Sequence, residues 1–98
     1  MEIVINHGDS LNVVLVGRLD TTTSPVLEKR LKEEDIKENL VILDFKDLEY
    51  ISSAGLRVLL ALKKNLEANK KSLEIHNIND VVNEVFKVTG FSNVLTIK

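Results

Sequence analysis

The chain contains no cysteine, a single proline and only four glycines. Without cysteine it can form neither a disulfide framework nor a thiolate metal site. Its 44% hydrophobic and 29% charged residues, with so little proline and glycine, are not the composition of a disordered or collagen-like chain. A chain of 98 residues is one ordinary domain, so we expect residues 1–98 to fold around a single core.

An excess of positive charge is also missing. The 13 lysines and arginines and the 15 aspartates and glutamates give a net charge of −2, which supplies no basic field for nucleic acid or an anionic membrane. The longest nearly apolar run, residues 58–62, is far shorter than the roughly 20 residues that span a bilayer. No basic segment followed by an apolar run marks a secretory signal. We therefore expect a cytoplasmic protein that binds neither nucleic acid nor membrane.

Motifs of common catalytic sites are absent as well. No G-x-S-x-G elbow surrounds Ser52 and Ser53, and no motif places His7 or His76 as their base. Neither a Walker-type phosphate loop nor G-x-G-x-x-G occurs. We predict a protein that is not an enzyme and needs no cofactor of its own.

The spacing of apolar residues predicts the order of secondary structure. Period-two alternation or a short continuous apolar run indicates five strands, at residues 3–5, 11–16, 40–43, 73–76 and 94–97. Helical spacing indicates three helices, at residues 24–34, 53–69 and from Asn79 or Asp80 to Thr89. We expect residues 17–23 to form a loop, Ser24 to cap the first helix before Pro25, and residues 44–50 to form a loop or short strand extension. The order β-β-α-β-α-β-α-β predicts an α/β domain with a mixed, mostly parallel sheet and helices packed on it.

Two serines stand where the third strand is expected to meet the second helix. If Ser52 is the N-cap, Ser53 falls in the first helical turn, where free N–H groups and the helix dipole favour negative charge. Two interpretations stay open at this point. The serines form a simple helix cap, or one of them accepts a phosphate, which adds about −1.5 to −2 charges. Gly55 would allow another part of the backbone to approach this turn closely.

Three segments resemble one family. The stretch DFKDLEYISSAGLRVLLALKK resembles the signature of STAS-domain proteins, in particular the bacterial anti-sigma factor antagonists, in which D-S-[ST]-G-L begins a helix after a strand and a short loop. Gly17-Arg18-Leu19-Asp20 is similar to the family's G-x-L-D turn, and VFKVTGFSNVLTI is similar to its closing helix and strand. The resemblance covers essentially the whole chain and implies a STAS-like fold.

The signature can be laid on this sequence residue by residue. It places Ser52 at the family's aspartate, Ser53 at its phosphorylated serine and Ala54 at the second hydroxyl position, followed by the Gly-Leu pair, Gly55 and Leu56. The resemblance thus implies that Ser53 is the phosphoacceptor. Because Ser52 replaces the acidic residue beside the acceptor, Ser52 becomes a rival site.

The resemblance also implies partners and a mechanism. In such proteins the unmodified domain binds an anti-sigma factor that is a serine kinase, and this releases the sigma factor. The kinase then phosphorylates the antagonist, which dissociates, and a metal-dependent serine phosphatase restores it. ATP and metal belong to those partners. The residues expected to contact the kinase are Asp20, Thr21, Thr22, Thr23, Ser52, Ser53, Ala54, Gly55, Leu56 and Arg57.

Two other hypotheses are weighed against the antagonist. A STAS-like adaptor subunit of a transporter, lipid-transport assembly or signalling complex would bind a protein that is not a kinase, and Ser53 would carry no phosphate. An enzyme with Ser53 as nucleophile would need a base, which no motif supplies. A monomer is expected, because no long coiled-coil heptad occurs.

Overall fold

A five-stranded sheet organises the computed structural model, which describes all residues, 1–98. The elements are β1 (Glu2–Asn6), β2 (Leu11–Leu19), α1 (Ser24–Glu33), β3 (Leu40–Ile51), α2 (Ser53–Ala68), β4 (Ser72–His76), α3 (Asp80–Thr89), a short 3-10 helix η1 (Phe91–Asn93) and β5 (Thr96–Ile97). The strands lie in the order β1-β2-β3-β4-β5. β1 is antiparallel to β2, and every other neighbouring pair is parallel. The predicted α/β class and element order are confirmed.

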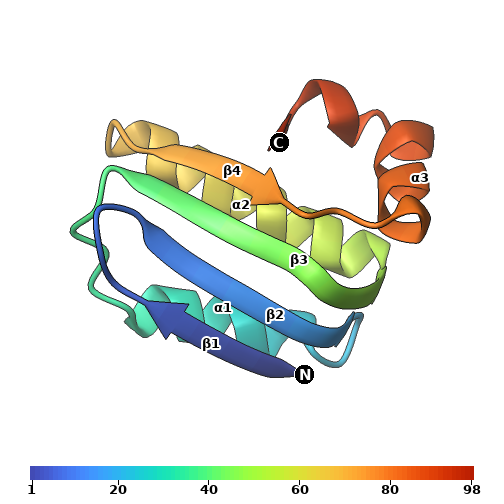
Figure 1. Ribbon diagram of the computed structural model, residues 1–98, viewed down its shortest axis with the longest axis horizontal. Helices are drawn as coiled ribbons and strands as arrows, with labels where there is room; N and C mark the ends of the chain where they lie inside the picture. Colours follow the sequence, from blue (N-terminus) through green and yellow to red (C-terminus); the bar gives the residue numbers. More distant parts are fainter.

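The domain has two layers. Helices α1 and α2 contact each other and lie behind the sheet, while α3 lies beyond one end of β3 (Figure 1). Side chains that point toward the helices, such as Val13, Leu43 and Ile75, are fully buried. The aromatic rings of Phe45 and Phe86 meet edge to face with their centroids 6.3 Å apart, which joins α3 to the same core. None of the three helices combines the length and the apolar character that a membrane crossing requires.

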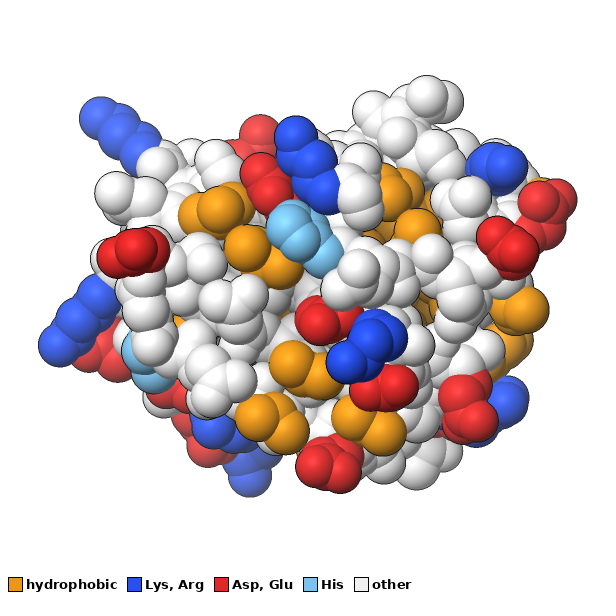
Figure 2. All heavy atoms as spheres, viewed as in Figure 1, with side chains coloured by type: hydrophobic (Ala, Val, Ile, Leu, Met, Phe, Trp, Pro, Cys, Tyr) orange, Lys and Arg blue, Asp and Glu red, His pale blue; other side chains and the backbone are white.

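The other face of the sheet carries no helix. Figure 2 shows this face, with hydrophobic side chains in its middle among acidic and basic ones. Val4 of the edge strand is exposed and pairs with Val14, which is half-buried like Ile42 on β3. The predicted alternation of side chains in residues 11–16 is therefore confirmed, but the side chains on the helix-free face of the sheet are only half-buried.

Two strands are longer than predicted. β2 continues through Leu19, so the loop expected over residues 17–19 is wrong. β3 continues through Ile51, so residues 44–50 form the strand extension that the sequence left open beside a loop. The two extensions pair with each other through Gly17↔Leu48 and Leu19↔Ile51, with register shifts that interrupt simple alternation. This pairing carries the ends of β2 and β3 to the same place, which positions the site described below.

Two boundaries also differ from the prediction. Helix α1 has Thr23 as its N-cap, and Ser24 is its first residue, donating its hydroxyl hydrogen to the carbonyl of Asp20. At the other end of the chain Val94 follows η1, and only Thr96 and Ile97 pair with β4. The predicted caps of α3 are confirmed, with Asn79 accepting from the N–H of Val82 and Gly90 in the left-handed conformation at φ 81°.

Candidate functional site

The carboxyl ends of β2 and β3 bring two segments together. The N–H of Ser52 donates to the carbonyl of Leu19 at 2.9 Å. The turn that follows β2 and the first turn of α2 are therefore neighbours, although about 30 residues of chain separate them. We call residues Asp20–Thr23 and Ser52–Arg57 together the α2 corner. It contains every site residue that the sequence predicted.

The two serines occupy different environments in this corner. Ser52 is the N-cap of α2, with extended backbone and a hydroxyl oxygen that accepts from the N–H of Gly55 at 3.3 Å. Its side chain is half-buried. Ser53 is the first residue of the helix and is exposed, and its hydroxyl makes no hydrogen bond within the chain. The predicted cap is confirmed, and the serine with the free hydroxyl is Ser53.

Gly55 and Leu56 lie inside the corner and not on its surface. A Cβ atom on Gly55 would stand 2.8 Å from Leu19 Cγ, 2.9 Å from Ile51 Cγ1 and 3.0 Å from the Leu19 carbonyl oxygen. Leu56 is part of the core. Both had been expected to contact a partner, and the structure corrects this, because α2 packs its first turn directly on the ends of β2 and β3. The close approach predicted at Gly55 is confirmed.

The turn after β2 is built around one carboxylate. Oδ1 of Asp20 accepts from the N–H groups of Thr22 and Thr23, both at 3.0 Å. The hydroxyl of Thr23 donates to the carbonyl of Arg18 at 2.7 Å and accepts from the N–H of Asp20 at 2.9 Å. This use of the hydroxyl explains why Thr23 caps α1 without a side-chain bond. Thr21 and Thr22 are exposed.

The same hydrogen bonds set the charge of the turn. The hydrogen bond from the N–H of Thr23 lowers the pKa of Asp20 below its ordinary value of 3.8. Partial burial raises this pKa, but the hydrogen bond from the N–H of Thr22 lowers it further. Asp20 is therefore ionised at neutral pH, and the stability that it contributes is lost only as the pH falls through this lowered pKa.

Two arginines lie at the α2 corner, Arg57 within it and Arg18 beside it. The guanidinium of Arg18 lies over the ring of Tyr50, 4.5 Å from its centroid, and 4.0 Å from the carboxylate of Asp20. Arg57 is exposed one helical turn after Ser53 and forms no ion pair within the chain. No group of three or more histidine, aspartate or glutamate side chains is arranged to hold a metal ion. The corner thus presents a free hydroxyl, an ionised carboxylate and an unpaired guanidinium.

The fold and the site define an α/β domain in which a serine-capped helix begins at the carboxyl end of a mixed, mostly parallel sheet. The model of the STAS domain family matches residues 1–98, and the chain belongs to this family. It is 27% identical over 99 residues to the anti-sigma-B factor antagonist of Listeria monocytogenes, covering all of this chain and 87% of that protein. It is 25% identical over 94 residues to the anti-sigma-B factor antagonist of Bacillus subtilis, covering 96% and 86%.

Solved structures share the fold at lower identity. The anti-sigma factor antagonist SpoIIAA in its unphosphorylated form superposes with a TM-score of 0.83 at 18% identity, covering 99% of this chain and 88% of that one. The Bacillus cell fate determinant SpoIIAA in its phosphorylated form gives 0.71 at 16%, covering 99% and 91%. A sulfate transporter family protein from Wolinella succinogenes gives 0.78 at 16%, covering 89% and 71%. These structures establish the fold, which occurs in both kinds of protein.

Proposed function

We propose that this domain is an anti-sigma factor antagonist controlled by phosphorylation of Ser53. In this proposal the unmodified domain binds an anti-sigma factor serine kinase, and the kinase releases its sigma factor. Phosphorylation then ends the complex, and a metal-dependent serine phosphatase resets the domain. The observation that carries the proposal is the exposed, unbonded hydroxyl of Ser53 at the start of α2. The names of the relatives and the existence of a phosphorylated form of SpoIIAA support it.

The contacts of the α2 corner favour Ser53 over its rivals as the acceptor. A phosphate on Ser52 would turn the oxygen that accepts from the N–H of Gly55 into a bulkier ester oxygen, which is a weaker acceptor. Loss of an N-cap typically costs about 1 kcal/mol. The hydroxyl of Thr23 is likewise occupied within its own turn. Ser53 can receive a phosphate without breaking a hydrogen bond of the folded domain.

The first turn of α2 is suited to a negative group. The first turn of a helix leaves N–H groups without an intrahelical acceptor. In α2 these are the N–H groups of Ser53 and Ala54, because the N–H groups of Gly55 and Leu56 donate to Ser52. The positive end of the helix dipole lies at the same place. Arg57 follows Ser53 by four residues on the same side of the helix, within the reach of an i,i+4 ion pair. We therefore propose that phosphorylation leaves the backbone in place.

The affinity change then arises at the docked surface itself. A tenfold loss of affinity requires only about 1.4 kcal/mol, whereas an unpaired charge left at a desolvated interface typically costs several. The proposed surface comprises the exposed side chains of Thr21, Thr22, Ser53 and Arg57 and the ionised carboxylate of Asp20. Gly55 and Leu56 act beneath it by fixing where Ser53 stands.

Locating the phosphate tests this proposal. The domain is incubated with ATP and the serine kinases of the anti-sigma type from the same genome, and the modified residue is identified by mass spectrometry. We expect one phosphate, on Ser53, that disappears in Ser53→Ala and persists in Ser52→Ala. Asp20→Asn keeps the Oδ1 acceptor of the turn and removes its charge, so weaker binding by this variant would place Asp20 in the interface.

Other outcomes of the same assay oppose the proposal. Phosphate on Ser52 would move the switch to the capping residue. If no such kinase binds or modifies the domain, the antagonist function is wrong and the adaptor alternative takes its place, since a sulfate transporter family protein has the same fold.

A further inference from the structure

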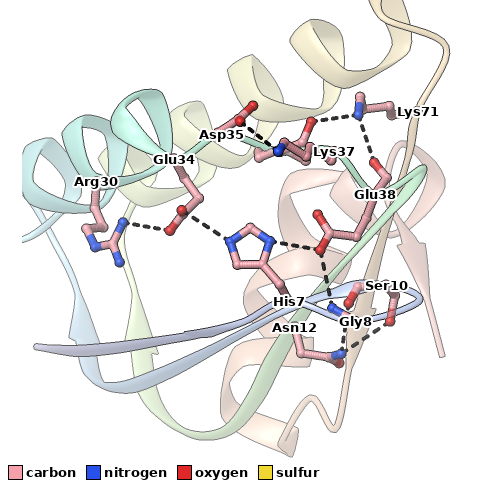
Figure 3. A network of polar contacts seen from close by, with 11 residues as sticks. His7, Gly8, Ser10, Asn12, Arg30, Glu34, Asp35, Lys37, Glu38 and Lys71 are labelled. Carbon is pink, nitrogen blue, oxygen red and sulfur yellow. Dashed lines mark hydrogen bonds and ion pairs between the residues drawn. The ribbon is translucent and has the colours of Figure 1, made fainter.

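A histidine joins two segments at the end of the sheet opposite to the α2 corner. His7 directly follows β1, and its Nδ1 lies 2.8 Å from Oε2 of Glu38 while its Nε2 lies 3.2 Å from Oε2 of Glu34 (Figure 3). The N–H of Gly8 donates to the same Glu38 oxygen at 3.2 Å. Glu34 is the C-cap residue of α1, and Glu38 lies just before β3. The turn between β1 and β2 is thereby fastened to the segment between α1 and β3.

The chemistry of these contacts fixes the protonation state of the ring. An ionised carboxylate offers only acceptors, so each nitrogen of His7 has to donate a hydrogen. A ring that donates from both nitrogens is an imidazolium ion. A neutral ring would turn one nitrogen lone pair toward a carboxylate, and that contact would become repulsive.

Burial makes the two carboxylates depend on this cation. The side chain of Glu38 is only 8% exposed and that of Glu34 18%. Oε1 of Glu38 is buried and has no hydrogen-bond partner, so the other oxygen carries the contacts with His7 and Gly8. Removing the proton of the ring would leave a mostly buried carboxylate with much weaker compensation.

The remaining charges around His7 are engaged elsewhere. On α1, Nη1 of Arg30 donates to the second oxygen of Glu34 at 2.9 Å. Lys71 directly precedes β4, and its Nζ donates to the main-chain carbonyls of Ile36 and Glu38, both at 2.8 Å. Figure 3 shows this arrangement around the ring. No cation other than His7 contacts the carboxylate of Glu38 within the chain.

The other charged side chains in the α1–β3 segment form an exposed ion pair. Lys37 and Asp35 lie 3.6 Å apart with both side chains in solvent. Exposed pairs of this kind contribute little to stability, so the charge of His7 is the one that holds the two segments together.

We propose that His7, Glu34 and Glu38 form a proton-dependent clamp, which holds the β1–β2 turn against the α1–β3 segment while His7 is an imidazolium and opens when the ring loses its proton. β1 is an edge strand that pairs only with β2, so the clamp fastens an element with few other attachments. It lies at the opposite end of the strands from Ser53 and does not depend on the proposed function.

The pH range of the clamp follows from the directions of the shifts. The hydrogen bonds to Glu38 and then to Glu34 raise the pKa of His7 above its ordinary 6.5. A group with a raised pKa gives its full stabilisation below 6.5, and this is lost as the pH rises through the pKa of the folded state. The clamp is therefore closed at pH 6.5 and below, and it opens as the pH rises through the raised pKa of His7.

The carboxylates set the acid limit. The bond from Arg30 and then that from His7 lower the pKa of Glu34 below its ordinary 4.5. Burial of Glu38 opposes its ionisation, but its own backbone N–H dipole and the hydrogen bonds from His7 and Gly8 outweigh this and lower the pKa of Glu38 as well. Their stabilisation is present above 4.5 and is lost as the pH falls through the lowered values.

Nuclear magnetic resonance of the full chain tests the clamp. The imidazole ¹⁵N resonances of His7 are followed against pH, with the chain unfolded in urea as reference. We expect both nitrogens to be protonated below the midpoint and the midpoint to lie above that of the unfolded chain. Glu34→Gln and Glu38→Gln should each shift the midpoint downward. Glu33→Gln removes the neighbouring exposed carboxylate, which pairs with Lys29, and should leave the midpoint unchanged.

Stability provides the second measurement. The wild-type chain should lose unfolding free energy above pH 6.5, and His7→Gln should remove this loss while His76→Gln retains it. If Glu38→Gln does not fold, Glu34→Gln carries the test, because its side chain is more exposed. A midpoint at or below that of the unfolded chain, or a midpoint unaffected by either glutamine, would overturn the clamp.

Discussion

Replacing Gly55 by alanine will lower the free energy of unfolding by about 1–3 kcal/mol, the usual range for an extra methyl group in a packed site. The new Cβ would stand 2.8–3.0 Å from Leu19 and Ile51. One of these contacts is the backbone carbonyl of Leu19, which cannot rotate away. Because Leu19 also accepts from Ser52, relief of the clash would push the start of α2 away from β2.

Urea denaturation of the variant and the wild type measures this cost. Gly8→Ala is the matched control, since a Cβ there would meet only an oxygen of Ser10 at an ordinary 3.6 Å, and it should change stability little. In a domain of this size each kcal/mol shifts the melting temperature by roughly 4–8 °C. A Gly55→Ala chain as stable as the wild type would show that the contact at the α2 corner is not close.

Replacing Ser53 by glutamate will weaken binding of the kinase partner at least about tenfold, while the domain itself stays at least as stable as before. The side chain is exposed and makes no hydrogen bond that the change would break. A carboxylate in the first turn of a helix is typically stabilising by about 0.3–1 kcal/mol. The loss of affinity therefore has to come from the docked surface, where the added charge has no partner.

Two controls separate this effect from a general one. Ser53→Ala adds no charge and should bind like the wild type without being phosphorylated. Ser72→Glu places the same charge at the start of β4, an exposed position at the opposite end of the strands, and should bind normally. Calorimetry with the purified kinase gives the three affinities. Equal weakening by Ser53→Glu and Ser72→Glu would mean that net charge, and not the α2 corner, controls binding.

The α2 corner could be predicted from the sequence because its determinants are local. A serine before a helical pattern has few other uses than a cap, and a glycine in the first turn signals a close approach. The burial of individual residues in the corner could not be predicted. The sequence does not show that Gly55 and Leu56 face β2 and β3, so it placed them on the partner surface with Ser53 and Arg57.

Long-range pairing accounts for the other differences. The extensions of β2 and β3 exist because residues 17–19 and 47–51 pair across the sheet, and the shifts in register remove the alternation by which a strand is recognised. The contacts of His7 with Glu34 and Glu38 span 27 and 31 residues. No local pattern indicates such contacts, and the sequence places His7 only between the first two predicted strands.

The central claim is that a phosphate on Ser53 switches off binding of the kinase. The most direct test compares one preparation of the domain before and after phosphorylation on Ser53, with the dissociation constant for the anti-sigma kinase measured under the same nucleotide and salt conditions. We predict that the phosphorylated form binds at least about tenfold more weakly, a difference of about 1.4 kcal/mol or more. Equal affinity of the two forms would contradict the claim, whatever residue the kinase modifies.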